Sequence, residues 1–263
     1  MINLHGDIHQ AYESSRTTLN SLRTNNYKFE NIAYELYLAY EARAWYQTVI
    51  SKNMSQAKND FYNCSIAAIK ETNSGKDVFE YRTLSALNAA LSDNHKILKE
   101  YEKVEYQLRG GPNKGKTNKD LAGLGKSHVL IDTIIKTMNK DYSGLSKNII
   151  IMESTFMTLK RNSVFENDFK FFKGLLAKDK DLIFESLNTM LTKEHKKRNR
   201  HCFYMKDIVS HPVIGYAKIS WINDIEIEFD NKLIHNALLP INPNNSYLNE
   251  ICKFEENGDE KND

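Results

Sequence analysis

The sequence has few cysteines, no signal-peptide pattern and no long apolar run, and each of these features argues against a class of protein. Three cysteines occur among the 263 residues, and their spacing matches no metal-binding or redox motif: Cys64, Cys202 and Cys252. This pattern suits a reducing compartment. The first residues hold no apolar core of signal-peptide length, and no later segment approaches the roughly 18 apolar residues of a membrane span. We therefore expect a cytoplasmic protein that does not enter a membrane.

The chain also lacks a strong excess of charge of either sign. Its formal net charge is +2, from 36 lysines and arginines against 34 acidic residues. Such a small excess does not indicate direct binding to nucleic acid, and it excludes the overall acidity of a global nucleic-acid mimic. Hydrophobic residues make up 41% and charged residues 27%, which is typical of a soluble globular protein with a substantial core. Charge therefore has to be examined segment by segment.

Arrangements for nucleophilic or metal-dependent chemistry are missing too. The sequence has no G-x-S-x-G motif, and no cysteine has an ordered histidine partner. His5 and His9 have the spacing of two metal ligands on a helix, but Gly6 and the terminal position weaken such a helix. A looser set lacks a paired Cys-x-x-Cys: His195, His201, Cys202 and His211. We expect no catalytic site, no metal and no cofactor.

One stretch does match the phosphate-binding loop pattern G-x-x-x-x-G-K-T. The matching residues are Gly110, Gly115, Lys116 and Thr117. A working loop of this kind follows a buried parallel strand, whereas residues 103–109 are mostly polar and are expected to continue a helix. We interpret the stretch as a glycine- and lysine-rich loop. A nucleotide-dependent enzyme is the less favoured alternative.

Most of the sequence has the apolar period of helices. In residues 29–50 the pairs Ile32/Leu36 and Trp45/Val49 lie four apart, which places aromatic side chains on the buried face of a long helix. Asp179 is placed to cap the second helix of a hairpin. The same period predicts the other helices: 7–23, 56–71, 77–91, 93–108, 121–139, 142–160, 165–176, 179–193 and 213–221.

Short breaks between these helices predict antiparallel neighbours. We expect a mostly α-helical fold of antiparallel hairpins, in a compact bundle or a tetratricopeptide-like stack, although no period of 34 residues is present. Residues 1–108 would form an N-terminal helical half and residues 121–255 a C-terminal half, joined by the loop 109–120 within one structural domain. Residues 256–263 are expected to be an acidic, disordered tail.

The hydrophobic period changes to two between residues 224 and 230, which predicts one short extended segment. Ile225, Ile227 and Phe229 would be buried in a short strand. The opposite side carries acidic residues about 7 Å apart: Asp224, Glu226, Glu228 and Asp230. Carboxylates held in this way repel one another and favour a basic partner surface. The favoured interpretation is a charged edge that prevents strand pairing, and a binding role is the alternative.

A basic segment lies at residues 193–206, with six lysines and arginines against one glutamate. It could bind phosphates or an acidic surface of a protein partner. The favoured interpretation is a solvated loop whose lysines complement a helix C-terminus. The candidate contact residues are Lys196, Lys197, Arg198 and Arg200.

Residues 211–241 combine three patterns in a fixed order. Gly-Tyr-Ala-Lys-x-x-Trp at 215–221 precedes Ile-Glu-x-Glu-x-Asp at 225–230, and Leu-Leu-Pro-Ile closes the stretch at 238–241. This order resembles the C-terminal signature of the immunity protein 49 family, and the layout of residues 171–199 is similar to the helical hairpin that precedes it there. The resemblance covers roughly the last 90 residues.

The resemblance implies a function in a bacterial polymorphic toxin system. Immunity proteins of such systems bind a cognate toxin and block its active site or its substrate-binding surface, without turnover. A nuclease toxin, with its basic cleft, would fit the acidic residues at 224–230. The alternative class is a helical adaptor or scaffold that binds a peptide or protein partner in a concave groove.

Overall fold

The described part of the chain folds mostly into helices, as its periodicity predicts. A computed structural model describes residues 4–25, 27–73, 83–199 and 205–259. Within these ranges the helices pack on one another without any β-sheet, and the only strand-like pairing is an isolated bridge between Gln107 and Thr117. The fold class is therefore mostly α. The short strand expected at residues 224–230 is extended but has no pairing partner among the described residues.

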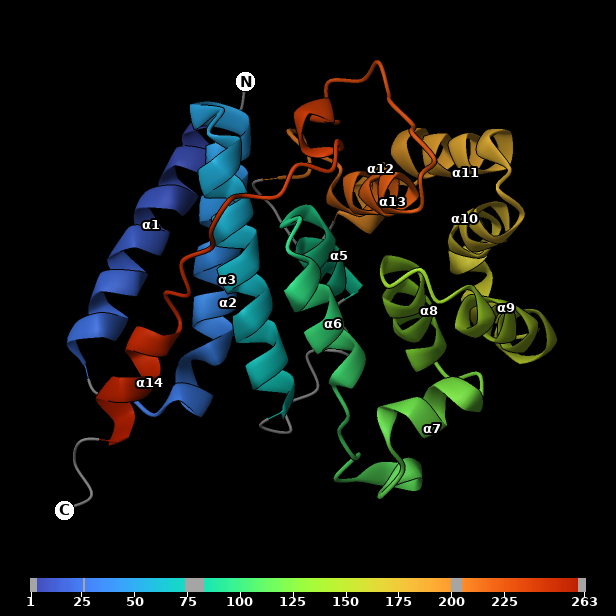
Figure 1. Ribbon diagram of the computed structural model, residues 1–263, viewed down its shortest axis with the longest axis horizontal. Helices are drawn as coiled ribbons and strands as arrows, with labels where there is room; N and C mark the ends of the chain where they lie inside the picture. The colour runs from blue at the N-terminus through green and yellow to red at the C-terminus, as the bar shows by residue number, and fades with distance from the viewer. Residues whose placement is uncertain (1–3, 26, 74–82, 200–204, 260–263) are drawn as a thin grey trace.

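Three helices form one side of the molecule: α1 (Leu4–Thr24), α2 (Phe29–Tyr46) and α3 (Met54–Asn73) (Figure 1). The π-helical turn Gln47–Ser51 extends α2. Helix α2 packs between α1 and α3, and its aromatic side chains are buried as expected. Trp45 is fully buried and meets Phe61 of α3 edge to face, with ring centroids 5.1 Å apart.

Two shorter helices lie in the middle of the molecule, α5 (Thr83–Leu91) and α6 (His95–Lys103) (Figure 1). Asn94 caps α6 by accepting hydrogen bonds from the backbone of Lys96 and Ile97. The expected helix 93–108 is thus too long, because α6 ends at Lys103. The expected helix 77–91 is confirmed over residues 83–91 as α5, while residues 77–82 and most of the break before them fall outside the described residues.

Beyond α6 the chain forms a hairpin-like arm with no helical period. Val104 and Tyr106 are buried while their neighbours are exposed, so this arm has a period of two. The side chain of Asn118 bonds the carbonyl of Val104 and the amide of Tyr106, at 3.2 and 3.1 Å. These bonds supply the partners that an extended chain requires, and they explain why the helix stops.

Helices α7 (Asn118–Gly123), α8 (His128–Met138) and α9 (Tyr142–Ile151) follow in sequence. Asp141 caps α9 by accepting from the amide of Gly144 at 2.8 Å. The helix expected to reach residue 160 ends sooner, because α9 passes into the π-helical turn Met152–Phe156 and then the 3-10 turn Lys160–Phe165.

The predicted hairpin near residue 178 is confirmed as α10 (Glu166–Ala177) and α11 (Lys180–Thr192). Asp179 caps α11 through a 2.9 Å bond from Leu182 N–H. The short helix α12 (His195–Arg198) leads toward α13 (His211–Ile222), which packs against α5 and α11. Every residue of α13 up to Ser220 is buried, so the helix forms part of the core.

The chain then returns to its beginning. After the 3-10 turn Asn236–Leu238, residues 241–251 run without helix along α3; we call them the C-terminal strap (Figure 1). Asn59 and Asn63 of α3 accept hydrogen bonds from the strap amides of Leu248 and Glu250, at 2.7 and 2.8 Å. Helix α14 (Cys252–Asp259) finally packs on α1 and α2. Residues 256–259, expected in the disordered tail, belong to α14 instead.

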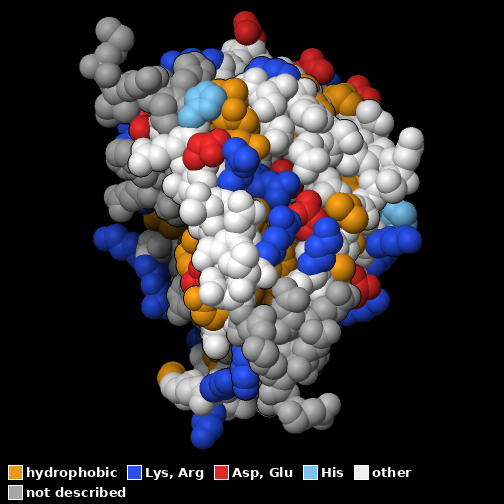
Figure 2. All heavy atoms as spheres, turned by 90° about the vertical axis from the view of Figure 1, so that its left-hand side faces the viewer, with side chains coloured by type: hydrophobic (Ala, Val, Ile, Leu, Met, Phe, Trp, Pro, Cys, Tyr) orange, Lys and Arg blue, Asp and Glu red, His pale blue; other side chains and the backbone are white. Residues whose placement is uncertain are grey.

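The face that includes α1 carries lysines and arginines beside acidic side chains, with hydrophobic side chains in small patches only (Figure 2). None of the described helices is long and apolar enough to cross a lipid bilayer.

Candidate functional site

The residues of the 215–221 motif anchor α13 inside the protein. Gly215 lies against Leu87 of α5 so closely that a Cβ at this position would be 2.7 Å from the Cβ of Leu87. Tyr216 donates its hydroxyl hydrogen to Asp168 Oδ1 at 2.7 Å. Glycine therefore permits the close approach of two helices here, and tyrosine ties α13 to α10.

Lys218 is buried, and its ammonium serves as a structural donor. Its Nζ donates to the carbonyls of Leu238, Leu239 and Pro240 at 2.8, 3.2 and 2.9 Å. It also forms an ion pair with Asp93. The lysine of the first motif thus holds the backbone of the closing Leu-Leu-Pro-Ile motif, so these two patterns form one structural unit.

Trp221 connects the same helix to the extended segment 224–230, which we call the connector. The indole Nε1 donates to the carbonyl of Ile227 at 3.0 Å. The ring is partly buried against the core. Asn236 pairs with both backbone groups of Phe229, accepting its N–H at 3.4 Å and donating to its carbonyl at 3.0 Å. Side-chain amide bonds therefore replace a neighbouring strand.

The burial pattern of the connector matches the predicted alternation. Ile225, Ile227 and Phe229 are buried, whereas the four acidic side chains between and beside them are exposed: Asp224, Glu226, Glu228 and Asp230. We call these four the acidic face. Asp224 pairs with Lys140 at 2.8 Å, and no described cation lies within ion-pair distance of the other three. The acidic face therefore offers three carboxylates to a partner.

The basic segment does not present one continuous surface. Lys196 and Lys197 are exposed, but Arg198 makes a two-bond ion pair with Asp168, at 3.2 and 2.7 Å, and contacts Glu194 at 2.5 Å. Its guanidinium is thus already occupied inside the protein. Arg200 lies outside the described residues, so the candidate surface is reduced to two lysines there.

The phosphate-loop pattern occurs in a setting without a parallel strand. The loop is closed by backbone bonds between Leu108 and Lys116 at 3.0 Å and between Gly115 and Leu108 at 2.9 Å. The Thr117 hydroxyl accepts from the amide of Asp120 at 3.1 Å in a capping box that begins α7. The threonine that would contact magnesium in a nucleotide site has a local structural partner here.

The histidines do not gather into a metal site in the described part of the chain, where no cluster of three metal-ligating side chains occurs. His9 is exposed and stands edge-on to Tyr46. His195 Nε2 contacts the carbonyl of Lys206, and His211 packs against Trp45 with ring centroids 4.9 Å apart. The positions of His201 and Cys202 and the side chain of His5 lie outside the description.

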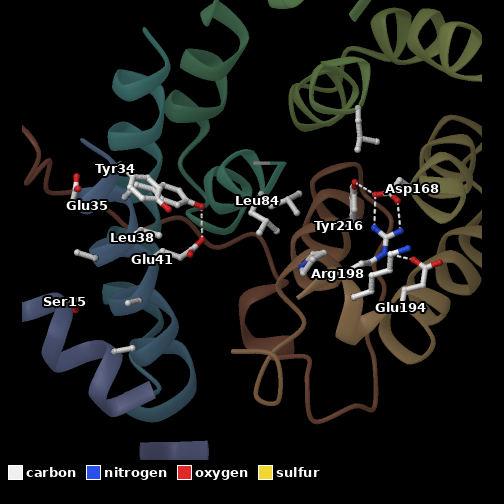
Figure 3. A pocket seen from close by; sticks show the side chains of 18 of the residues that line it. Ser15, Tyr34, Glu35, Leu38, Glu41, Leu84, Asp168, Glu194, Arg198 and Tyr216 are labelled. Atoms are coloured by element: carbon white, nitrogen blue, oxygen red, sulfur yellow. Dashed lines mark hydrogen bonds and ion pairs between the residues drawn. The ribbon is translucent and has the colours of Figure 1, made fainter. Parts of the chain in front are cut away.

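A cleft of about 910 Å³ lies between several helices, and the sequence analysis did not predict it. Helices α1 and α2 line one side, and the turn Lys160–Phe165 with α10, α12 and α13 lines the other (Figure 3). Leu84 of α5 lies between the two sides. No residue of the connector lines the cleft. Its residues come from distant parts of the chain, and no local motif marks them.

Each side of the cleft carries a tyrosine bonded to a buried carboxylate. Tyr37 donates to Glu41 Oε1 at 2.9 Å, and Asn88 donates to the same oxygen at 2.9 Å. Tyr216 donates to Asp168 on the other side (Figure 3). Burial, followed by the adjacent carboxylate, raises the pKa of Tyr37 and of Tyr216. Both phenols therefore remain protonated donors and hold the carboxylates in place.

Comparison with known proteins adds no assignment to this geometry. The chain matches no protein-family model, no curated protein and no solved structure.

Proposed function

We propose that this protein is an immunity protein that binds a bacterial toxin stoichiometrically through the acidic face. The observation that supports the proposal is the display of Glu226, Glu228 and Asp230 at alternate positions of a connector held by Trp221 and Asn236. The resemblance of the 215–241 region to the immunity protein 49 family supports the same function.

A fixed row of carboxylates suits a basic partner surface for two physical reasons. The backbone bonds of the connector hold the charges in place before binding, so less conformational entropy is lost on association. Unpaired surface charges also accelerate the encounter with an oppositely charged cleft. Toxins that attack nucleic acid carry such clefts, and the row would occupy the position of phosphates. The proposal requires no turnover and no cofactor.

The test is the double variant Glu226→Lys with Glu228→Lys, produced together with the toxin encoded by the neighbouring gene. Both side chains are exposed, so folding should remain intact. Association should become slower by about tenfold or more and should lose most of its salt dependence. Stopped-flow mixing at two ionic strengths measures the rate, and survival of toxin-producing cells measures protection.

The control is Glu100→Lys with Glu153→Lys, which changes net charge equally at exposed positions elsewhere. This control should bind and protect like the parent. If the Glu226 and Glu228 double variant also protects cells and binds as fast as the parent, the acidic face is only a solvated edge.

A further inference from the structure

The cleft of about 910 Å³ has an apolar lining that is open to solvent on both sides. Leu38 on α2 and Val164 on the opposite side are each 40% exposed. Leu84 is partly buried between them (Figure 3). Apolar side chains that stay exposed in a concave surface of this volume are typical of a binding site.

The charged side chains of the cleft favour a cationic ligand. Four carboxylates and two cations line it: Glu35, Glu41, Asp168, Glu194, Lys197 and Arg198. Both Asp168 and Glu194 already bind Arg198, so this arginine is not available to attract an anion. The exposed Lys197 lies on α12, across the cleft from Glu35 of α2. Glu35 is exposed one helical turn from Leu38. The edge of a ligand that covers Leu38 would therefore lie near the carboxylate of Glu35, which favours a cation at that edge.

The walls of the cleft also indicate the shape of its ligand. Helices and helical turns form them, and no strand edge is present among the described residues for an extended peptide to pair with. The side chains that α1 contributes are short and lie on one face of that helix: Ala11, Ser14, Ser15 and Thr18. Short side chains leave room for bulky residues from another helix.

We propose that this cleft binds an amphipathic helix of a protein partner, with the apolar face of that helix against Leu38, Leu84 and Val164 and its basic flank toward Glu35. This site goes beyond the proposed toxin contact, because the two surfaces share no residue. The two can therefore fail or succeed separately.

The test uses a fluorescent synthetic helix of leucine and lysine, about 18 residues long, and anisotropy with the full-length protein. The parent should bind this peptide, and Leu38→Lys and Val164→Lys should each weaken binding by about tenfold or more. The matched control is Leu176→Lys on α10, since Leu176 is 37% exposed and does not line the cleft. This control should bind like the parent.

Three results would overturn the site. The first is absence of binding by the parent, and the second is equal weakening by Leu176→Lys. The third is equal binding of a scrambled peptide or of a leucine–glutamate helix, which would exclude an amphipathic shape or a basic flank. If the parent self-associates in sedimentation and Leu38→Lys makes it monomeric, a second copy of this chain occupies the cleft instead, and the proposal of a separate protein partner is wrong.

Leu38→Lys should leave toxin association unchanged. Failure of the cleft proposal is therefore distinguishable from failure of the acidic-face proposal.

Discussion

The carboxylate of Asp93 binds the ammonium groups of two buried lysines, Lys218 and Lys58. Oδ1 lies 2.5 Å from Lys218 Nζ, and Oδ2 lies 2.7 Å from Lys58 Nζ. The three side chains are at most 4% exposed. Burial lowers the pKa of Lys218 to about 8, although Asp93 opposes this shift. One carboxylate thus joins α13, α3 and the turn between α5 and α6.

Replacing Lys218 by methionine should be strongly destabilising. The change leaves three backbone carbonyls without their donor and removes one partner of a buried ion pair. We expect the free energy of unfolding to fall by about 3 kcal/mol, measured by urea denaturation. Lys140→Met is the control, because Lys140 forms an exposed ion pair with Asp224 and should cost less than about 1 kcal/mol. Equal effects would contradict a structural role for the buried ammonium.

Gly215→Ala should separate α13 from α5. The added methyl group would lie 2.7 Å from the Cβ of Leu87, so the backbone of α13 or of α5 has to move. We expect a loss of about 1 to 3 kcal/mol in thermal or urea unfolding. Gly123→Ala is the matched control, because nothing lies within 4 Å of its added Cβ. That control should be neutral or slightly stabilising, and a neutral Gly215→Ala would mean that the two helices pack more loosely.

Asp60 should make stability depend on pH. Burial raises its pKa to about 7, and Arg43 at 2.9 Å opposes this only in part. Between about pH 4 and about pH 7 the folded chain keeps a proton that the unfolded chain has lost, so this contribution to stability falls as the pH rises. We expect the parent to lose up to a few kcal/mol relative to Asp60→Asn between about pH 5 and about pH 8, measured by urea unfolding at each pH.

Asp120→Asn provides a contrast of opposite sign. Hydrogen bonds from Thr117 lower the pKa of Asp120, so the contribution of this carboxylate to stability is present above the unfolded pKa and is lost on acidification.

The Asp60 prediction is contradicted if the stability of the parent and of Asp60→Asn follows the same pH profile. Asp60 would then be ionised in the folded protein throughout the range from about pH 5 to about pH 8.

Arg198→Met should lower the stability of the protein much more than the same change at an exposed lysine of the basic segment. The change removes both hydrogen bonds that the buried carboxylate of Asp168 accepts from Arg198 and leaves the one that it accepts from Tyr216. We expect a loss of about 3 to 5 kcal/mol in denaturant unfolding. Lys196→Met changes the same charge at an exposed position and should alter stability by less than about 0.5 kcal/mol. Similar values for the two variants would place Arg198 at the surface in solution.

Local patterns in the sequence predicted the elements whose causes are local. Asp179 caps α11 as expected, because a cap and the amide that it accepts are three residues apart. The alternation at 225–230 predicted which side chains of the connector are buried, since a period of two needs no knowledge of the partner. The prediction of a helix at 93–108 is wrong beyond Lys103, because the side chain of Asn118, from a later segment, bonds the backbone of Val104 and Tyr106 there.

The interior polar groups could not be predicted in this way. Lys218 finds backbone carbonyls twenty and more residues away, and a carbonyl belongs to every residue type alike. Arg198 looked like part of a basic surface because its partner Asp168 lies 30 positions earlier. The cleft joins side chains from α1 to α13, so no window of sequence contains it.

The C-terminal strap also affects when this protein can fold during synthesis. Helices α1 to α3 leave the ribosome first, but Asn59, Asn63 and Lys58 bond residues 242 to 250. At roughly 5 to 20 residues per second, α3 waits roughly 8 to 35 s for these partners. During that interval the asparagines and the lysine of α3 face solvent or a chaperone. A chain that terminates before the strap never acquires these hydrogen-bond partners. An uncovered α3 is therefore a physical mark by which cellular quality control can distinguish a chain without the strap from one that carries it.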